Sequence, residues 1–413
     1  MSPAPLNARQ LDTDPLTAAP PAEYQRRLFL VQRTMAARSL AALVVADPAN
    51  LYYLSGYNAW SFYMPQCMII PAEGQPHFFA RAMDAAGAGF GSELADNRDR
   101  VHGYPEDLVH RPDVHPYDWI ADLACELGLL PRIGKPADGQ VAIEGDANFF
   151  SARGYLALAG RVGADRIVDS AELVNWIRVV KSDYEQARLR RAGVICTNAM
   201  LTAMEAIEAG MRQCDVVARI SAAQASGTTE FGGDYPAIVP MLPTGASAGV
   251  PHLTWNADRF VEGEATTIEL SGVYQRYHAP LARTVMLGTA PPRLSRVAGI
   301  ITDGMTALLE LVKPGITGDE AHAAFDAVLV RHGLTKESRV GYSIGIGYPP
   351  DWGERTVSLR RGEQTELRAG MAFHVIAGMW MDGWGYEMSE SILVQPDGVE
   401  RLTDVDQGLR VKG

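Results

Sequence analysis

Residues 178–192, RVVKSDYEQARLRRA, divide the chain into two parts. Ser182 is followed three residues later by Glu185, the spacing of a capping box in which each side chain bonds the backbone N–H of the other residue. We therefore predict a long helix that begins after Ser182 and ends near Ile207. Residues 171–182 are predicted to form a helix that connects this part to a preceding domain.

The residues before this junction have the pattern of an α/β domain. Apolar residues recur at helical spacing over residues 23–40, and the run AALVV at 41–45 is typical of a buried strand. Further short strands are predicted at residues 68–70, 77–79 and 141–143. We expect an N-terminal domain over residues 23–170, preceded by a flexible tail, residues 1–22, that is rich in Pro and Ala. Because 413 residues exceed one ordinary core, residues 183–413 are expected to form a second domain of strands and helices.

Composition limits the class of protein and its partners. Hydrophobic residues make up 47% and charged residues 21%, which is typical of a folded globular chain. The net charge of -12 disfavours binding to a nucleic-acid backbone. No run of about eighteen apolar residues and no N-terminal leader pattern is present, so we expect no membrane association. The four cysteines have no CxxC spacing and are expected to be buried free thiols of a cytoplasmic protein: Cys67, Cys125, Cys196 and Cys214.

Residues 178–192 resemble the junction that opens the catalytic domain of the creatinase/prolidase family, the pita-bread enzymes. The resemblance implies an α/β fold, in which a smaller creatinase-like N-terminal domain precedes a C-terminal pita-bread domain over residues 183–413. It also implies a homodimer. Metal-dependent members of the family hold two ions with two Asp, one His and two Glu, so the corresponding positions of this chain can be compared with that ligand set.

The segment TTIELSGVYQRYHAPLART, residues 266–284, has the layout of the family's metal motif without its ligands. In the family, the second Asp precedes an Arg-Thr pair by about three residues, and this chain has Pro280 there. The first Asp lies eleven residues earlier, where this chain has Glu269. Only one carboxylate therefore remains in this motif.

Two of the other three ligand positions are altered as well. Tyr342 stands where the family has its His, and a phenol at neutral pH is a poor metal ligand. Ile376 takes the position of the first metal Glu, and either Glu387 or Glu390 could match the last one. At least three of the five ligands are missing, so we expect no catalytic metal and no cofactor.

Two residues are the candidate catalytic groups. His252 takes the position of a catalytic His that metal-free creatinases also retain, and an imidazole can shuttle a proton at neutral pH. A lone His is more often structural, but its place between a Gly/Pro-rich loop and a strand favours catalysis. Glu269 could be a solvated residue at a strand edge. The resemblance instead implies that it faces His252 on the floor of the site, as a nucleophile or as the base that activates water.

Longer matches are similar to one branch of the family, whose members open the cyclic amidine ring of ectoine. They cover residues 50–57, 60–63, 231–240, 251–255, 274–281, 348–356 and 390–394. This resemblance implies hydrolysis of ectoine or hydroxyectoine to N-acetyl-2,4-diaminobutyrate without a metal. Aromatic faces beside carboxylates would suit the amidinium cation, and the candidate substrate-binding residues are Trp60, Tyr63, Trp255, His278, Arg283, Tyr342, Asp351, Trp352, Glu354, His374, Glu387 and Glu390.

Several roles within this set stay open. His278, Arg283 and His374 are equal candidates for binding the substrate carboxylate. Trp60 and Tyr63 are expected to reach the site of the partner subunit in a homodimer. Two other functions are possible on this fold: a metal-dependent Xaa-Pro dipeptidase or related C–S lyase, and a non-catalytic protein that binds a small molecule.

Overall fold

The computed structural model describes residues 19–135 and 138–413 of the chain, which separates into two compact units between Arg178 and Val179. Most of the predicted tail, residues 1–22, lies outside the described residues. Its end is corrected by the first helix, α1 (Pro21–Ala37), which begins at Pro21. Among the described helices, none combines the length and the apolar character that crossing a membrane requires.

The N-terminal unit is an α/β domain built on a six-stranded sheet, ordered β4-β3-β2-β1-β5-β6 within the described residues. The predicted strands at 41–45, 68–70, 77–79 and 141–143 are confirmed. Two helices, α4 and α5, pack on the sheet through a core that contains Ile120, Val141 and Leu158. The bounds of these elements are β1 (Leu40–Val45), α2 (Pro48–Ser55), β2 (Cys67–Pro71), β3 (His77–Arg81), β4 (Val101–Tyr104), α4 (Pro116–Glu126), β5 (Gln140–Ile143), α5 (Ala152–Val162) and β6 (Ile167–Asp169).

The junction differs from the prediction in its helix. Helix α6 (Leu173–Arg178) is shorter than the expected span 171–182. Ala171 and Glu172 have φ angles of 48° and 55°, which are incompatible with a right-handed helix. The long helix is confirmed as α7 (Asp183–Ala206), and its capping box forms through Ser182 and Glu185.

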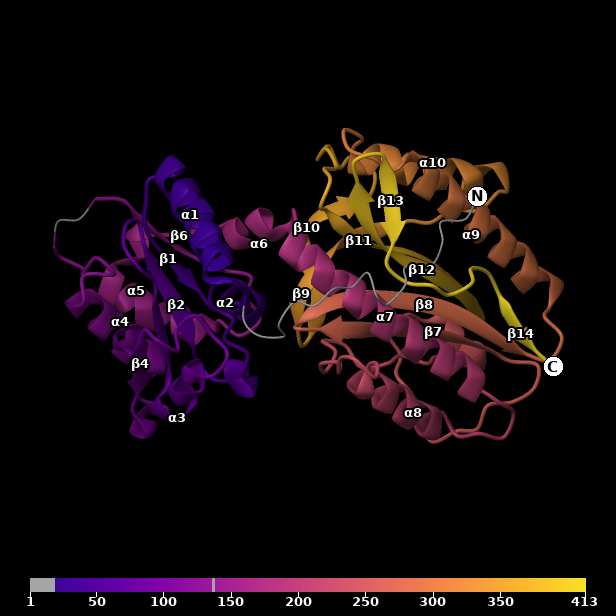
Figure 1. The fold of residues 1–413 in the computed structure, drawn as a ribbon, viewed down its shortest axis with the longest axis horizontal. Coiled ribbons are helices and arrows are strands. Elements are labelled where there is room, and N and C mark those ends of the chain that lie inside the picture. Colours follow the sequence, from indigo (N-terminus) through magenta and orange to yellow (C-terminus); the bar gives the residue numbers. More distant parts are fainter. Residues whose placement is uncertain (1–18, 136–137) are drawn as a thin grey trace. The chain divides into compact units, whose positions relative to one another are not determined.

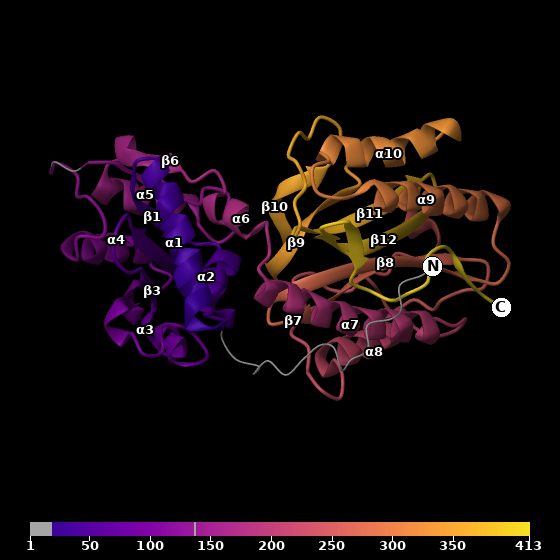
Figure 2. The same cartoon turned by 45° about the horizontal axis from the view of Figure 1, so that its top comes forward.

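The C-terminal unit places an eight-stranded sheet between two pairs of helices. Helices α7 and α8 pack against the β7–β8 part of the sheet, and α9 and α10 pack against its β11–β12 part (Figures 1 and 2). The strands follow the order β13-β12-β11-β9-β8-β14, while β10 pairs with β9 and β7 pairs with β8. The bounds are α8 (Gln213–Ser226), β7 (Ala265–Tyr274), β8 (Tyr277–Leu287), α9 (Pro292–Leu311), α10 (Gly318–Arg331), β9 (Gly341–Tyr348), β10 (Asp351–Leu359), β11 (Ala372–Met381), β12 (Trp384–Gln395), β13 (Gly398–Arg401) and β14 (Arg410–Lys412).

Each pair of helices covers its own hydrophobic core. Ile268 and Leu270 of β7 pack with residues of α7, whereas Val375 of β11 and Met388 of β12 pack with residues of α9 and α10. Side chains alternate along a strand, so the intervening residues point away from these cores. The face of the sheet that points away from both cores, its inner face, therefore carries polar residues of β7, β11 and β12.

The cysteines are all free, as expected. Cys67 and Cys196 are buried, but Cys125 and Cys214 are partly exposed, which corrects the expectation that all four lie in the core.

Gly272 lets helix α7 approach β7 closely. A Cβ atom at this position would overlap the backbone of Ala192 and Cys196. We expect Gly272→Ala to lower the melting temperature by at least about 5 °C, because helix backbone cannot move away as a flexible side chain would. Gly299→Ala is the control, since Gly299 lies in α9 with open space around its Cβ, and alanine should raise helix stability by up to about 1 kcal/mol. Equal melting temperatures for Gly272→Ala and the wild type would contradict the close approach.

Candidate active site

Two buried carboxyl groups form the centre of the candidate site. Glu269 lies in the middle of β7 and is 7% exposed, and Glu387 lies on β12 and is 6% exposed. Burial raises the pKa of Glu269 well above its usual value, and the charges of Glu387 and then Asp351 raise it further. Burial also raises the pKa of Glu387 to about 7, although the cation of Lys336 opposes this shift. The folded protein therefore favours the protonated forms of this acid pair, Glu269 and Glu387.

Strand β8 brings the two carboxyl groups together. Ala282 lies opposite Glu269 in the antiparallel β7–β8 pair, and its N–H donates to the Ser389 hydroxyl at 2.6 Å. The Thr284 hydroxyl donates to the Glu387 carbonyl oxygen at 2.8 Å and accepts from the Glu387 N–H at 2.9 Å. Thus β8 pairs with β7 through its backbone and contacts β12 through side chains.

A chain of hydroxyl and imidazole groups lies next to the acid pair. The Trp352 indole N–H donates to the Tyr342 hydroxyl at 2.9 Å. The same hydroxyl lies 2.9 Å from Nδ1 of His374, and Nε2 of His374 lies 2.7 Å from the Ser389 hydroxyl. Burial lowers the pKa of His374 to about 3, so its ring is neutral and carries one proton at physiological pH.

A count of the donors among these hydrogen-bonded side chains shows one proton that is not used in a bond between them. The Trp352 indole and the Ala282 N–H can only donate, so neither takes a proton from the chain. Tyr342, His374 and Ser389 together hold three protons but form only two bonds among themselves. In one tautomer of His374 the remaining hydroxyl proton belongs to Ser389, and in the other it belongs to Tyr342. The Tyr342–His374–Ser389 group can therefore present a hydrogen-bond donor near Glu269, whose charge adds to the effect of burial in raising the pKa of Tyr342.

Ser389 is a functional candidate that the sequence analysis missed. It lies two residues after Glu387 on β12, so both side chains leave the strand on the same face. This alternation was the available signal, but a serine in a strand is too common to be singled out. Its importance comes from Ala282 and His374, which are distant in sequence.

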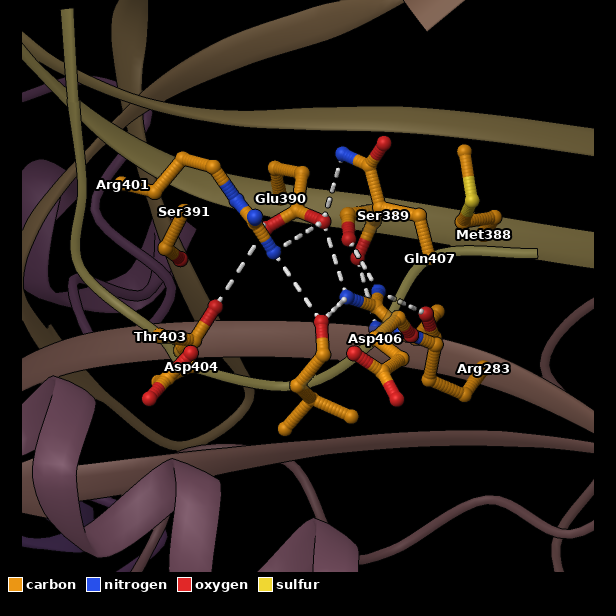
Figure 3. A network of polar contacts seen from close by, with 12 residues as sticks. Arg283, Met388, Ser389, Glu390, Ser391, Arg401, Thr403, Asp404, Asp406 and Gln407 are labelled. Carbon is orange, nitrogen blue, oxygen red and sulfur yellow. Dashed lines mark hydrogen bonds and ion pairs between the residues drawn. The ribbon is translucent and has the colours of Figure 1, made fainter. Parts of the chain in front are cut away.

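Glu390 faces the opposite side of β12 from Glu387. It forms a buried ion pair with Arg283 at 2.8 Å and a second pair with Arg401 at 3.1 Å, and it accepts from Gln407 at 3.0 Å (Figure 3). The Arg283 guanidinium also donates to the backbone oxygens of Ala282, Ser389, Val405 and Asp406. This network joins β8, β12 and the C-terminal segment.

Two further predicted residues have polar atoms that bond within the protein. Nε2 of His278 accepts the Ala237 N–H at 2.9 Å, and its Nδ1 lies 2.8 Å from the Arg276 carbonyl oxygen. Burial lowers the pKa of His278 well below its usual value, so the ring is neutral. Glu354 is buried against Lys181, with 2.6 Å between Oε2 and Nζ.

The remaining predicted residues lie at exposed or half-buried positions. His252 occupies an exposed turn with a φ angle of 64°, and in the described part of the chain no hydrogen bond or ion pair joins it to Glu269. Trp255 is half-buried against the core under α7 and α8, and Asp351 is exposed at the start of β10. In the N-terminal unit, Trp60 and Tyr63 are 56% and 62% exposed on a 3-10 turn.

The side chains of this site do not fit a pair of metal ions. Within residues 19–135 and 138–413, no three His, Cys, Asp or Glu side chains are grouped so that they could hold an ion. Two carboxyl groups beside a phenol and a neutral imidazole do not offer the oxygen-rich set that two hard cations require. A separate cavity of about 220 Å³, lined by Glu264, Arg293 and Trp384, does not include Glu269 or Glu387.

Comparison with known protein families identifies both units. Residues 27–180 match the creatinase/prolidase N-terminal domain, and residues 187–396 match metallopeptidase family M24. The chain belongs to the creatinase/prolidase family. Its architecture, a creatinase-like domain followed by a pita-bread domain, is the one that the sequence predicted.

Individual members of the creatinase/prolidase family give a more detailed comparison. An ectoine hydrolase of Halomonas elongata is 42% identical over 94% of this chain and 97% of its own length. An uncharacterised hydrolase/peptidase of Sinorhizobium fredii is 38% identical over 95% of this chain and 98% of its own. The dipeptidase PepE of Mycobacterium ulcerans has a similar fold, with a TM-score of 0.77 at 22% identity over 95% of this chain and 99% of its own.

The acid pair should make stability depend on pH. Because the folded-state pKa of each carboxyl group is raised, the unfolded chain releases these protons more readily, and stability falls as pH rises through the folded-state values. We expect Glu387→Gln to raise the melting temperature by roughly 3 to 6 °C at pH 9 and by much less at pH 5. Thermal unfolding at both pH values tests this, with exposed Glu337→Gln as the control. An equal gain at pH 5 and pH 9 would contradict the buried pair.

Proposed function

We propose that this chain hydrolyses the cyclic amidine ring of ectoine or hydroxyectoine to N-acetyl-2,4-diaminobutyrate, without a catalytic metal. The observation that carries this proposal is the buried pair Glu269 and Glu387 at a site whose side chains do not suit two metal ions. The 42% identity to an ectoine hydrolase over nearly the whole chain supports it. The alternative, a metal-dependent dipeptidase, rests on the shared fold.

The chemistry of an amidinium suits a pair of carboxyl groups. An amidinium is a delocalised cation, and its central carbon is already electrophilic without a Lewis acid. When it binds, its charge favours ionised carboxylates, so it should displace the proton that the acid pair retains. Glu269 then attacks this carbon or activates the water that attacks it. One water is added, one ring C–N bond breaks, and the product is an amide with a free amine.

The departing ring nitrogen needs a proton, and the proposal includes two sources. His252 is the first, because its imidazole lies in a solvent-exposed turn and an imidazole can act as a general acid. The Tyr342–His374–Ser389 chain is the second, since one of its hydroxyl protons is not used inside the chain. A homodimer in which Trp60 and Tyr63 of one subunit reach the site of the other is also part of this proposal.

Ring opening can be followed directly by proton NMR. We expect chelator-treated protein to convert ectoine to an N-acetyl-2,4-diaminobutyrate, and Glu269→Gln to reduce kcat by at least about 1,000-fold while circular dichroism and melting temperature show a folded protein. Glu337→Gln serves as the control. Activity that returns only after metal is added would support the dipeptidase alternative. Substantial turnover by Glu269→Gln would overturn the assignment of this carboxylate.

The pH dependence of kcat/KM should report the acid pair. Below the pKa of Glu387, about 7, this carboxyl group is protonated and no longer supplies a negative charge for the amidinium. We therefore expect kcat/KM to fall by about tenfold per pH unit on the acidic side of a value near 7. A profile that stays flat down to pH 5 would show that neither carboxyl group must ionise.

A further inference from the structure

The proposed substrate has a carboxylate as well as an amidinium, and the structure points to a site for it. The three cationic or donor candidates from the sequence are engaged inside the protein. Arg283 bonds Glu390 and four backbone oxygens, and both ring nitrogens of His278 and of His374 already have partners. The carboxylate therefore requires other donors.

Arg339 is a cation beside Tyr342 with unused donors. Its guanidinium carbon lies 4.3 Å from the centre of the Tyr342 ring, and its Nη1 donates to the Ser358 hydroxyl at 3.1 Å. Ser358 lies opposite Tyr342 in the β9–β10 pair. No other hydrogen bond or ion pair joins Arg339 to the described residues, so Nε and Nη2 remain available on an exposed side chain.

Lys336 is a second cation, three residues before Arg339. Its ammonium group donates to the Gly378 carbonyl oxygen at 3.0 Å and to the Ser338 hydroxyl at 2.8 Å. Gly378 lies directly opposite Glu387 in the β11–β12 pair. The ammonium group also lies 4.8 Å from the centre of the Trp380 ring. Burial lowers the pKa of Lys336 to about 8, which leaves it mostly charged at pH 7.

Both cations lie beside groups of the candidate site, Arg339 over the Tyr342 ring and Lys336 on the carbonyl oxygen of Gly378, opposite Glu387. Beyond the effect of burial, the negative charge of Glu269 raises the pKa of Tyr342, and the positive charge of Arg339 lowers it. Against the effect of burial, the positive charge of Lys336 lowers the pKa of Glu387. A ligand that carries an amidinium and a carboxylate a few bonds apart is a zwitterion of matching polarity. An arginine with free Nε and Nη2 can bind a carboxylate through two parallel hydrogen bonds.

We propose that Arg339 and Lys336 form the subsite for the substrate carboxylate, with Arg339 as its main ligand, while Glu269 and Glu387 hold the amidinium. This inference rests on the proposed function. The subsite selects zwitterionic cyclic amidines over amidines that are only cationic. It also fixes the direction of the ring, because the carboxylate end is held beside Tyr342.

The test compares two substrates that differ only in the carboxylate: ectoine and 2-methyl-1,4,5,6-tetrahydropyrimidine. For Arg339→Ala we expect kcat/KM for ectoine to fall by about 30- to 100-fold, mainly through KM, as expected for loss of a charged bidentate contact. The same variant should change kcat/KM for 2-methyl-1,4,5,6-tetrahydropyrimidine, which has no carboxylate, by less than about threefold. Lys336→Met should lower kcat/KM for ectoine more than for the amidine without a carboxylate, but it should change both, because the Lys336 cation also acts on Glu387. Arg296→Ala is the matched control, since Arg296 lies on α9 and bonds the His332 carbonyl oxygen.

Each outcome bears on a different claim. Equal losses for both substrates with Arg339→Ala would overturn the subsite, because Arg339 would then act through Tyr342 rather than on the carboxylate. Arg355 lies on β10, the strand that also carries Ser358. An ectoine-specific loss with Arg355→Ala, and none with Arg339→Ala, would overturn the subsite as well. A wild-type protein that opens neither amidine would overturn the proposed function and the subsite with it. If Arg339→Ala unfolds, calorimetric binding of ectoine to Arg339→Lys gives the same comparison, with weaker binding expected for ectoine alone.

Discussion

Burying two carboxyl groups within electrostatic reach of each other is the constraint on which the candidate site depends. An ionised carboxylate away from water is costly unless it is paired, and a second negative charge nearby adds to the cost. Glu269 and Glu387 have no ion pair among the described residues, in contrast to Glu390 and Glu354, each of which is paired with a cation. The pair lowers its cost by keeping a proton, and a cationic ligand would lower it further. A site of this kind is therefore suited to bind a cation that displaces a proton.

The fold creates this situation through strand alternation and two separate cores. Strand β7 places Ile268 and Leu270 against α7, which leaves Glu269 on the inner face. Strand β12 places Met388 against α9 and α10, which leaves Glu387 and Ser389 on the inner face. The outer faces provide the hydrophobic free energy of folding, so the inner face can carry polar groups that contribute little to stability. Function and stability are thus assigned to alternate residues of the same strands.

Local patterns made much of the fold predictable. The capping box of Ser182 and Glu185 located α7, and the matched segments located the family. The position of Glu269 followed from the motif, and its burial removes the idea of a solvated strand edge. Partners that lie far apart in the sequence were not predictable, because no local pattern records them. Arg283 bonds Glu390, 107 residues away, and Ser389 receives the N–H of Ala282. Lys336 and Arg339 were not predicted for the same reason, because their roles depend on contacts with Gly378 of β11 and Tyr342 of β9.

Substrate charge gives a physical reason for the altered ligand set, on the proposed function. A metal ion polarises a neutral carbonyl oxygen, which carries a partial negative charge. An amidinium has no such oxygen, and its positive charge would be repelled by two divalent cations at the same place. Replacing the ligands by Pro280, Tyr342 and Ile376 removes the means of holding those cations, while Glu269 and Glu387 remain as the negative partner. On this proposal the substrate supplies the electrophilic centre, so the protein does not need a metal ion for that purpose. The protein must then contribute a carboxylate, a proton donor and a cation that binds the substrate's own carboxylate.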